Sequence, residues 1–271
     1  MNYFDQNSLA RLDSIFAQLK KTVPSAYIPF QIKEDHLIVH GETIKIAVAE
    51  TISDAWTLAY PSYKEKFETD KIFRTIMNFA AGKWLEPQSA SDPFWILLAE
   101  NKFDCEDDLL ETLCHELRIC SDFIRAYHRY SGGAHTADDP DLLLHLQELK
   151  NSHRYLQFEL WSEFNGVYTA TAVHFAMDKS DPTISTLCAY LGYQTGEIAE
   201  PMLRHFSDVE ATDYDLSRYL GVHYAVRDLS RAYCKARIFE LGNLLPACIL
   251  KKAANADRIA NDYLKIDIFE F

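Results

Sequence analysis

The chain has 271 residues, which suits one large domain or two small ones, and 48% of them are apolar, so it can bury a sizeable core. Acidic residues outnumber basic ones by 40 to 27, and the net charge is −13. This charge disfavours binding to nucleic acids and to anionic membranes, because both depend on clustered lysine and arginine. It suits a basic protein partner.

The sequence also indicates in which cellular compartment the protein is expected. The N-terminus lacks the basic region and apolar run of a signal peptide, and no window reaches the ~18 apolar residues of a membrane span. The six cysteines form no CxxC pair, and several fall on apolar helical stripes, where a reduced cysteine packs as a small hydrophobe. We therefore expect a cytoplasmic protein without membrane segments.

The N-terminal third predicts a helix, then strands, then further helices. Residues 7–21 have the apolar spacing of an amphipathic helix, and residues 27–49 are rich in β-branched residues, which predicts two or three antiparallel strands. Residues 51–85 predict helices interrupted at Pro61. The helix that begins at Asp70 is expected to bury its large apolar side chains, which are Ile72, Phe73, Ile76, Met77 and Phe79.

Residues 86–93 (EPQSASDP) form the most linker-like segment of the chain. We expect residues 1–271 to fold as one compact α+β unit, with a soft boundary at this segment. Such a boundary would separate an α+β part at 1–85 from a mainly helical part at 94–271. The short apolar run that follows, from Phe94 to Leu98, suits either a strand or the start of a helix.

The longest periodic stretch predicts a central helix from about Asp107 to Tyr130, ended by Gly132 and Gly133. Its apolar arc is wide, so neighbours are expected to cover most of its sides. Glu116 falls inside that arc. A carboxylate there needs a partner or takes up a proton at a raised pKa.

The C-terminal half reads as mainly helical. A helix is expected from Asp141 to Leu149. For residues 154–177 the sequence permits two different structures. Their Asn-Gly pair favours a β-hairpin, whereas the roughly helical spacing of their apolar residues permits a helix; we favour the hairpin. Four further helices are expected, at residues 183–192, 195–206, 213–241 and 244–264. The predicted fold is a helix-dominated α+β class, with a small N-terminal antiparallel sheet packed on helices and a mostly helical C-terminal half.

The pair His115-Glu116 lies in the middle of the central helix, in the stretch TLCHELRICSD. It resembles the HExxH helix of zinc metallopeptidases, in which two histidines one turn apart bind zinc and the glutamate is the base. Ile119 stands where the second histidine is required. We therefore predict no metal site and no cofactor, and take His115 and Glu116 as candidate catalytic residues. A divalent metal is expected only under the alternative that downstream histidines complete a different site: His128, His135 and His145.

Two Arg/His spacings resemble those of helical ribonucleases of the HEPN class. They are Arg218 with His223, and Arg129 with His135. His223 also lies on an apolar helical stripe, so a buried structural histidine is the competing interpretation.

Two charged clusters are candidates for ion binding. The acidic run at residues 138–141 suits Mg²⁺ or Ca²⁺, but a loop that caps a helix is the simpler account. A basic stripe follows a C-terminal helix at i, i+4 and i+8, and its residues are Arg227, Arg231 and Lys235. These three residues are candidate anion-binding residues, and pairing of the stripe with acidic helices is the favoured account.

No nucleophile elbow, phosphate loop, dinucleotide fingerprint or kinase motif is present, and the sequence leaves open whether the protein is an enzyme. We expect an intracellular protein-binding or inhibitory protein that engages a basic protein partner through an acidic, aromatic-rich surface. A toxin-neutralising immunity protein is one form of it. The alternative is a hydrolase with a metal or acid–base site on the central helix, and a HEPN-like ribonuclease is a weaker one.

Overall fold

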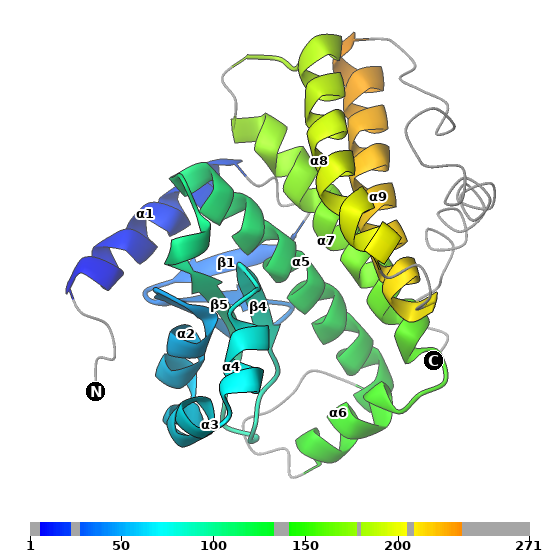
Figure 1. The fold of residues 1–271 in the computed structure, drawn as a ribbon. Coiled ribbons are helices and arrows are strands. Elements are labelled where there is room, and N and C mark those ends of the chain that lie inside the picture. The colour runs from blue at the N-terminus through cyan, green and yellow to red at the C-terminus, as the bar shows by residue number, and fades with distance from the viewer. Residues whose placement is uncertain (1–5, 23–27, 133–140, 178–179, 205–208, 235–271) are drawn as a thin grey trace. The chain divides into compact units, whose positions relative to one another are not determined.

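The computed structural model describes residues 6–22, 28–132, 141–177, 180–204 and 209–234. Contacts between residues divide the chain into two compact units, Met1–Asn151 and Ser152–Phe271. Helices dominate both units, and the first also contains a sheet (Figure 1). The predicted helix-dominated α+β class is therefore confirmed.

The first unit begins with the expected helix and strands. These elements are α1 (Gln6–Thr22), β1 (Phe30–Lys33), β2 (His36–Val39) and β3 (Glu42–Ala49). The three strands pair antiparallel in order, as predicted. A two-residue turn at His40 and Gly41 joins β2 to β3, with φ angles of 52° and 92°. Glycine adopts a positive φ freely, whereas histidine does so at a cost in backbone strain.

Among the described residues the sheet has five strands, in the order β1-β2-β3-β5-β4. The additional strands are β4 (Gly82–Leu85) and β5 (Phe94–Ala99). β5 runs parallel to β3 and antiparallel to β4, so the sheet is mixed rather than antiparallel throughout. The parallel pair is possible because the helices between β3 and β4 carry the chain across the sheet. Residues 86–93 connect the neighbouring strands β4 and β5.

The strand β5 is apolar along its length because both faces of the sheet are covered. Leu97 and Ala99 belong to a buried cluster with residues of α2 (Ile52–Ala59). On the other face, the ring of Phe94 lies 6.3 Å from that of Phe123 in α5 (Glu106–Ser131). The alternation of side chains along a strand thus places α2 and α5 on opposite faces (Figure 1).

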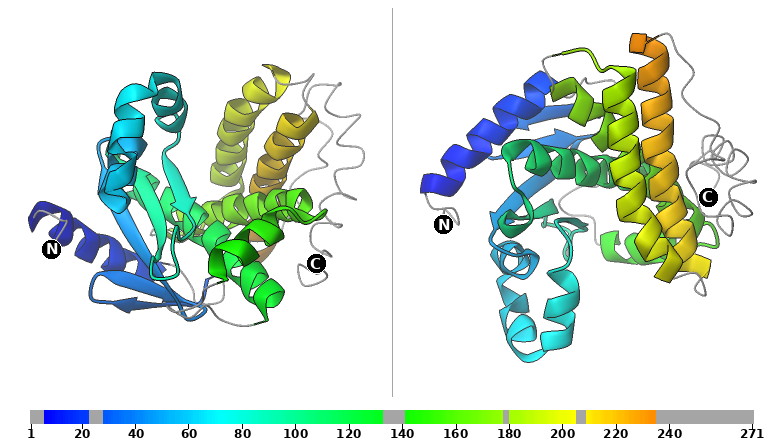
Figure 2. Two further views of the ribbon diagram at one scale, coloured as in Figure 1. Left: turned by 90° about the horizontal axis from the view of Figure 1, so that it is seen from below. Right: turned by 45° about the horizontal axis from the view of Figure 1, so that its top comes forward.

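Three short helical elements follow α2, and the predicted break at Pro61 is confirmed. They are a 3₁₀ turn (Pro61–Tyr63), α3 (Lys64–Thr69) and α4 (Lys71–Met77). Figure 2 shows α3 and α4 at one extremity of the first unit, beyond α2. Trp56, Phe67 and Phe73 hold this end together, with ring centroids 5.2 to 6.1 Å apart.

The predicted burial of α4 is correct for one side of the helix and wrong for the other. Phe73 and Met77 pack against the Trp56 cluster. Ile72, Ile76 and Phe79 are instead exposed, by 75%, 55% and 76% of their surface. The reason is geometric: positions 73 and 77 are rotated by about 100° from 72 and 76, and they alone turn toward the cluster that α4 packs on.

The central helix α5 has nearly the predicted bounds, and Gly132 ends it with a φ of 81°. Asp141 precedes α6 (Leu142–Lys150), which packs on α5. Residues 133–140 lie outside the described part of the chain.

The described residues of the second unit form three long helices. They are α7 (Tyr155–Met177), α8 (Ile184–Arg204) and α9 (Val209–Leu229), and a π turn (Ser230–Cys234) extends α9. Both α7 and α8 pack along α9 (Figure 1). Gly221 makes the approach of α9 to α7 possible, because a Cβ atom there would lie 2.6 Å from the carbonyl oxygen of Phe164.

Two expectations for this unit are wrong. Residues 155–177 form a helix and not the favoured hairpin, since apolar side chains on all sides of a buried helix imitate two apolar strands. In addition, α8 runs unbroken through Gly192, where two helices were expected, because one exposed helical glycine costs only about 1 kcal/mol. The helix expected at 244–264 lies outside the described residues.

Candidate functional site

The two candidate catalytic residues on α5 have different surroundings. His115 is half-buried, whereas Glu116 is only 8% exposed. The Glu116 carboxylate accepts a hydrogen bond from the backbone N–H of Trp84 in β4, over 3.0 Å. β4 is an edge strand, so Glu116 supplies the acceptor that a further strand would otherwise provide.

Gly82 allows this close approach of β4 to α5. A Cβ atom at Gly82 would lie 2.6 Å from Thr112 Cγ2 and 2.8 Å from Glu116 Cγ. The Trp84 ring also packs on Phe123, with centroids 4.6 Å apart. Glu116 is thereby held against the sheet edge.

No group of three or more histidine, cysteine, aspartate or glutamate side chains within the described ranges is arranged to hold a metal ion. Of the histidines considered for such a site, His128 lies near the end of α5, His145 lies on α6, and His135 falls outside those ranges. Asp138 and Asp139 of the acidic run also fall outside them.

A second group of polar side chains on α5 faces the turn between β2 and β3. His40 Nε2 and Ser121 Oγ share a hydrogen bond of 2.9 Å, and His128 Nε2 lies 2.6 Å from Glu42 Oε1. Both Ser121 and Glu42 are buried. We call this group, together with the ion pairs of Asp122, the turn network.

Asp122 is the most buried charge of the turn network, with 1% of its surface exposed. Arg118 Nε donates to its carboxylate over 2.9 Å, and Arg125 lies 3.8 Å from it. A buried carboxylate needs such compensation to stay ionised. The i,i+4 pair of Arg118 and Asp122 is readable in the sequence, but its burial is not.

The electrostatics of the turn network act on His40. Burial lowers the pKa of His40, and the positive charges of Arg125, His128 and Arg118 lower it further. His40 also has the strained φ of 52°. Strained backbone and a shifted pKa are common at functional sites and also occur in structural networks.

Glu42 of this network also lines a small cavity of about 280 Å³. The other lining residues are Gly41, Thr43, Lys45, Ala90, Ser91, Asp92 and Pro93. The carboxylate–imidazole pair of Glu42 and His128 can hold or move a proton beside this space. Sequence reasoning missed Glu42 and His40 as site residues, because their partners lie more than 80 positions away along the chain.

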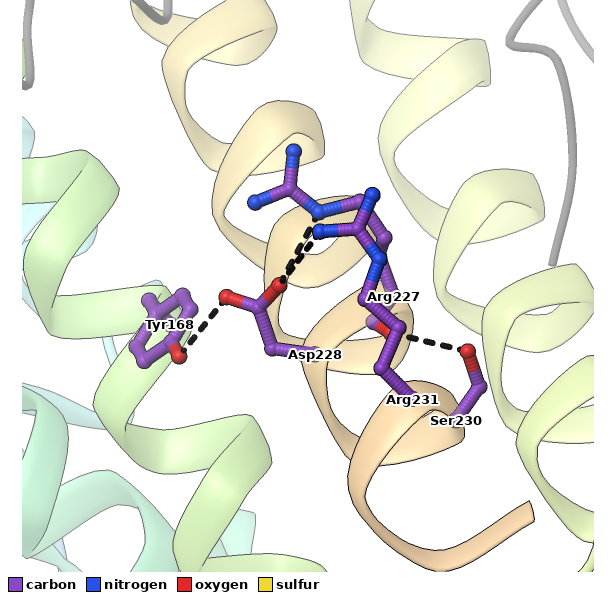
Figure 3. Close-up of polar contacts among 5 residues, drawn as sticks. All are labelled: Tyr168, Arg227, Asp228, Ser230 and Arg231. Atoms are coloured by element: carbon purple, nitrogen blue, oxygen red, sulfur yellow. Dashed lines mark hydrogen bonds and ion pairs between the residues drawn. The ribbon is translucent and has the colours of Figure 1, made fainter. Parts of the chain in front are cut away.

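Two residues of the basic stripe, Arg227 and Arg231, lie at the end of α9 and in the π turn that extends it (Figure 3). Arg227 Nε donates to Asp228 Oδ1 over 3.0 Å, and Arg231 Nη1 lies 3.7 Å from the same oxygen. The Tyr168 hydroxyl donates to the other oxygen of Asp228 over 3.2 Å. The structure thus brings together Arg227 and Arg231 around an acid of the same helix, and Lys235 lies outside the described residues.

The structure also shows the surroundings of Arg218 and His223, which have the ribonuclease-like spacing. Arg218 lies 3.5 Å from Glu163 of α7, and His223 is buried among aromatic side chains. His135, the partner proposed for Arg129, is not among the described residues.

An exposed apolar surface lies on α4. It consists of Ile72, Ile76 and Phe79, which share one side of the helix and its following turn, and we call it the α4 stripe. Isolated exposed apolar residues are ordinary, whereas grouped ones mark interaction surfaces.

A groove of about 420 Å³ lies beside α4. It is lined by Ser53, Asp54, Thr57, Leu58, Lys64, Phe67, Glu68 and Arg74. Leu58 is exposed, whereas Phe67 is buried in the aromatic cluster behind the groove. The groove has an apolar wall and charged rims of both signs.

Within the described part of the chain, no helix has the length and apolarity needed to cross a membrane. Comparison with protein-family models, with curated proteins and with solved structures found no match to this chain.

Proposed function

We propose that this is a protein-binding protein that engages its partner through the α4 stripe. A single observation carries the proposal: three large apolar side chains of α4 and the turn that follows it are all more than half exposed. Surfaces of this kind bind proteins because covering them removes apolar area from water, at about 25 cal/mol per Å². An inhibitory protein, such as a toxin-neutralising immunity protein, is one form of this function.

The position of the stripe supports the proposal. α4 is held by Phe73 and Met77 on its inner side, so that the outer side is presented on a fixed support. A rigid support lowers the entropy lost on binding. On α6, Leu143 and Leu144 are also exposed, but they are consecutive and point about 100° apart, so they form no stripe.

The overall charge of −13 supports a basic partner, steered at long range. This charge belongs to the whole chain, so it favours a basic partner without locating the contact surface.

Site-specific photo-crosslinking tests the proposed function. A photoreactive amino acid at Thr75, which is exposed beside the stripe, should capture a protein partner from the native lysate. The same amino acid at Lys33, exposed on β1, serves as the matched control. Capture must disappear when Ile76 and Phe79 are changed to aspartate; capture that persists in that variant would count against the stripe.

Acid–base hydrolysis is the second candidate function. The observation that favours it is the contact of Glu42 with both His128 and the cavity of about 280 Å³. A peptide, ester and phosphoester substrate panel would show turnover in the wild type that His128→Gln abolishes. Turnover unaffected by this change would remove His128 from the reaction, and a metal analysis of the purified protein tests the metal-dependent form.

A further inference from the structure

The tip of the hairpin formed by β2 and β3 is attached to α5 by two histidine contacts. His40 Nε2, at the tip, shares a hydrogen bond of 2.9 Å with Ser121 Oγ of α5. Just beyond the tip, Glu42 Oε1 lies 2.6 Å from His128 Nε2 of the same helix. The outer side of the tip is open: Gly41 is exposed, and nothing lies within 4 Å of the position that a Cβ atom would take there. The contacts with α5 therefore hold the tip in place.

The same tip forms one wall of the cavity of about 280 Å³. Gly41, Glu42 and Thr43 line this cavity from the hairpin, and residues 90–93 line it from the connection between β4 and β5. Below the tip, both strands are fixed by buried apolar side chains, which are Leu37, Val39, Ile44 and Ile46. A movement of the tip alone would therefore widen the cavity while the strands stay in place.

A proton on His40 would meet a positive environment in this closed arrangement. The charged groups of the turn network around His40 are Arg118, Asp122, Arg125 and His128 of α5 and Glu42 of the hairpin. The two carboxylates are already engaged, that of Asp122 by both arginines and that of Glu42 by His128. Burial lowers the pKa of His40, and the charges of Arg125, His128 and Arg118 lower it further. The closed tip therefore favours the neutral imidazole.

Release of the tip removes these penalties. In water the imidazole of histidine has a pKa of about 6.5, so a released His40 takes up a proton more readily than the closed one. The contribution of His40 to the closed state is fully present above about pH 6.5 and is lost as the pH falls through the lowered pKa of the closed state. The imidazolium also has no acceptor nitrogen for the Ser121 hydroxyl, whereas the neutral ring has one.

We propose that His40 is a pH-sensitive latch: its neutral imidazole holds the hairpin tip on α5, and its protonation in mildly acidic solution releases the tip and opens the cavity beside Glu42. The latch involves neither the α4 stripe nor a hydrolytic reaction, so it goes beyond the proposed function. Protonation of a partly buried histidine is a recurring way in which a protein changes between two local states.

Hydrogen–deuterium exchange of the full chain tests the latch. Exchange of the backbone amides of residues 38–43 is measured at about pH 7.5 and about pH 5.5, on either side of the ordinary histidine pKa. The labelling times are scaled to the exchange rate of an unprotected amide at each pH. We expect the protection of this segment to fall by about threefold or more at the lower pH, while β5 keeps its protection.

Two histidine variants give the matched comparison. His40→Asn keeps a side chain that tolerates the positive φ but does not titrate, so the protection of the tip should no longer depend on pH. His36→Asn removes a histidine of the same hairpin, whose imidazole pairs with Asp35 at the other end of β2. This variant should respond to pH as the wild type does. Ser121→Ala removes the hydrogen-bond partner of His40 and should lower the protection of the tip already at the higher pH.

Three results would overturn the latch. The first is protection of the tip that does not change with pH in the wild type, or that falls equally in His40→Asn. The second is a fall that disappears in His36→Asn, because the responsible group would then be the other histidine. The third is an equal loss of protection in β5, which would show unfolding of the whole unit and not release of the tip. None of these results bears on the α4 stripe, so the latch and the proposed function fail separately.

Discussion

Glu116 of the central helix accepts a hydrogen bond from the backbone N–H of Trp84, at the exposed edge of the sheet, over 3.0 Å. This contact explains how a carboxylate sits within the apolar arc of α5. Its acceptor oxygen reaches a backbone donor that has no neighbouring strand. The geometry gives Glu116 a structural contact, and its catalytic assignment with His115 stays a prediction.

Removal of this acceptor should destabilise the first unit. Glu116→Ala leaves the Trp84 N–H without its partner, and we expect a loss of about 1–3 kcal/mol in the free energy of unfolding. Glu116→Gln keeps an acceptor oxygen of the same reach and should lose clearly less. Urea denaturation measures both variants, and equal stability of Glu116→Ala and the wild type would refute the structural role.

Two glycines of the second unit are expected to respond differently to substitution by alanine, because only Gly221 lies where α9 packs closely on α7. In Gly221→Ala the new methyl group would lie 2.6 Å from the backbone oxygen of Phe164, so the helices must separate. We expect a loss of about 1–3 kcal/mol. Gly192→Ala adds a methyl group with nothing within 4 Å and should be neutral or stabilise by up to about 1 kcal/mol. Similar melting temperatures for the two variants would contradict this packing.

The turn network predicts a pH dependence that His40 carries. Because the folded-state pKa of His40 is lowered, chiefly by burial, the unfolded chain takes up a proton first as the pH falls. The contribution of His40 to stability is thus fully present above its ordinary pKa of about 6.5 and is lost as the pH falls through the folded-state value. His40→Asn, which tolerates the positive φ, should flatten this part of the stability–pH curve. Parallel curves for the variant and the wild type, measured by denaturation between about pH 7 and 5, would show that His40 is not the responsible group.

The predicted anion site on α9 can be tested through Asp228. This residue accepts from Arg227 and lies beside Arg231, so a bound anion must compete with its carboxylate. Asp228→Asn removes that negative charge, and we expect inorganic phosphate to raise the melting temperature of the variant more than that of the wild type. Arg231→Ala is the control in which the effect should vanish. If phosphate shifts neither protein, the anion prediction is wrong.

Local sequence signals predicted much of the fold. The β-branched residues of 27–49, the break at Pro61 and the glycine that ends α5 act over a few positions, and each is found in the structure. The exceptions arise from long-range packing. The hairpin signal at Asn165-Gly166 was overridden because α7 is buried against α9, a contact that no local pattern encodes.

The candidate site was predicted less well, for a related physical reason. The sequence places Ser121 and His128 within the central helix, but their partners His40 and Glu42 come from a turn formed far away in the sequence. The α4 stripe was missed because periodicity identifies apolar residues and does not show whether a second surface is present to cover them. Ile72 and Phe73 are equally apolar in sequence, and only the direction of packing separates them.

Binding of the photo-crosslinked partner tests the central claim most directly. Isothermal titration calorimetry should compare the wild type with Ile76→Asp/Phe79→Asp, and with Leu143→Asp/Leu144→Asp as a control that changes two exposed apolar residues of α6. We predict that the α4 variant weakens binding at least tenfold, about 1.4 kcal/mol, whereas the α6 variant binds as the wild type does. Equal affinities for the wild type and the α4 variant would contradict a binding function for the α4 stripe.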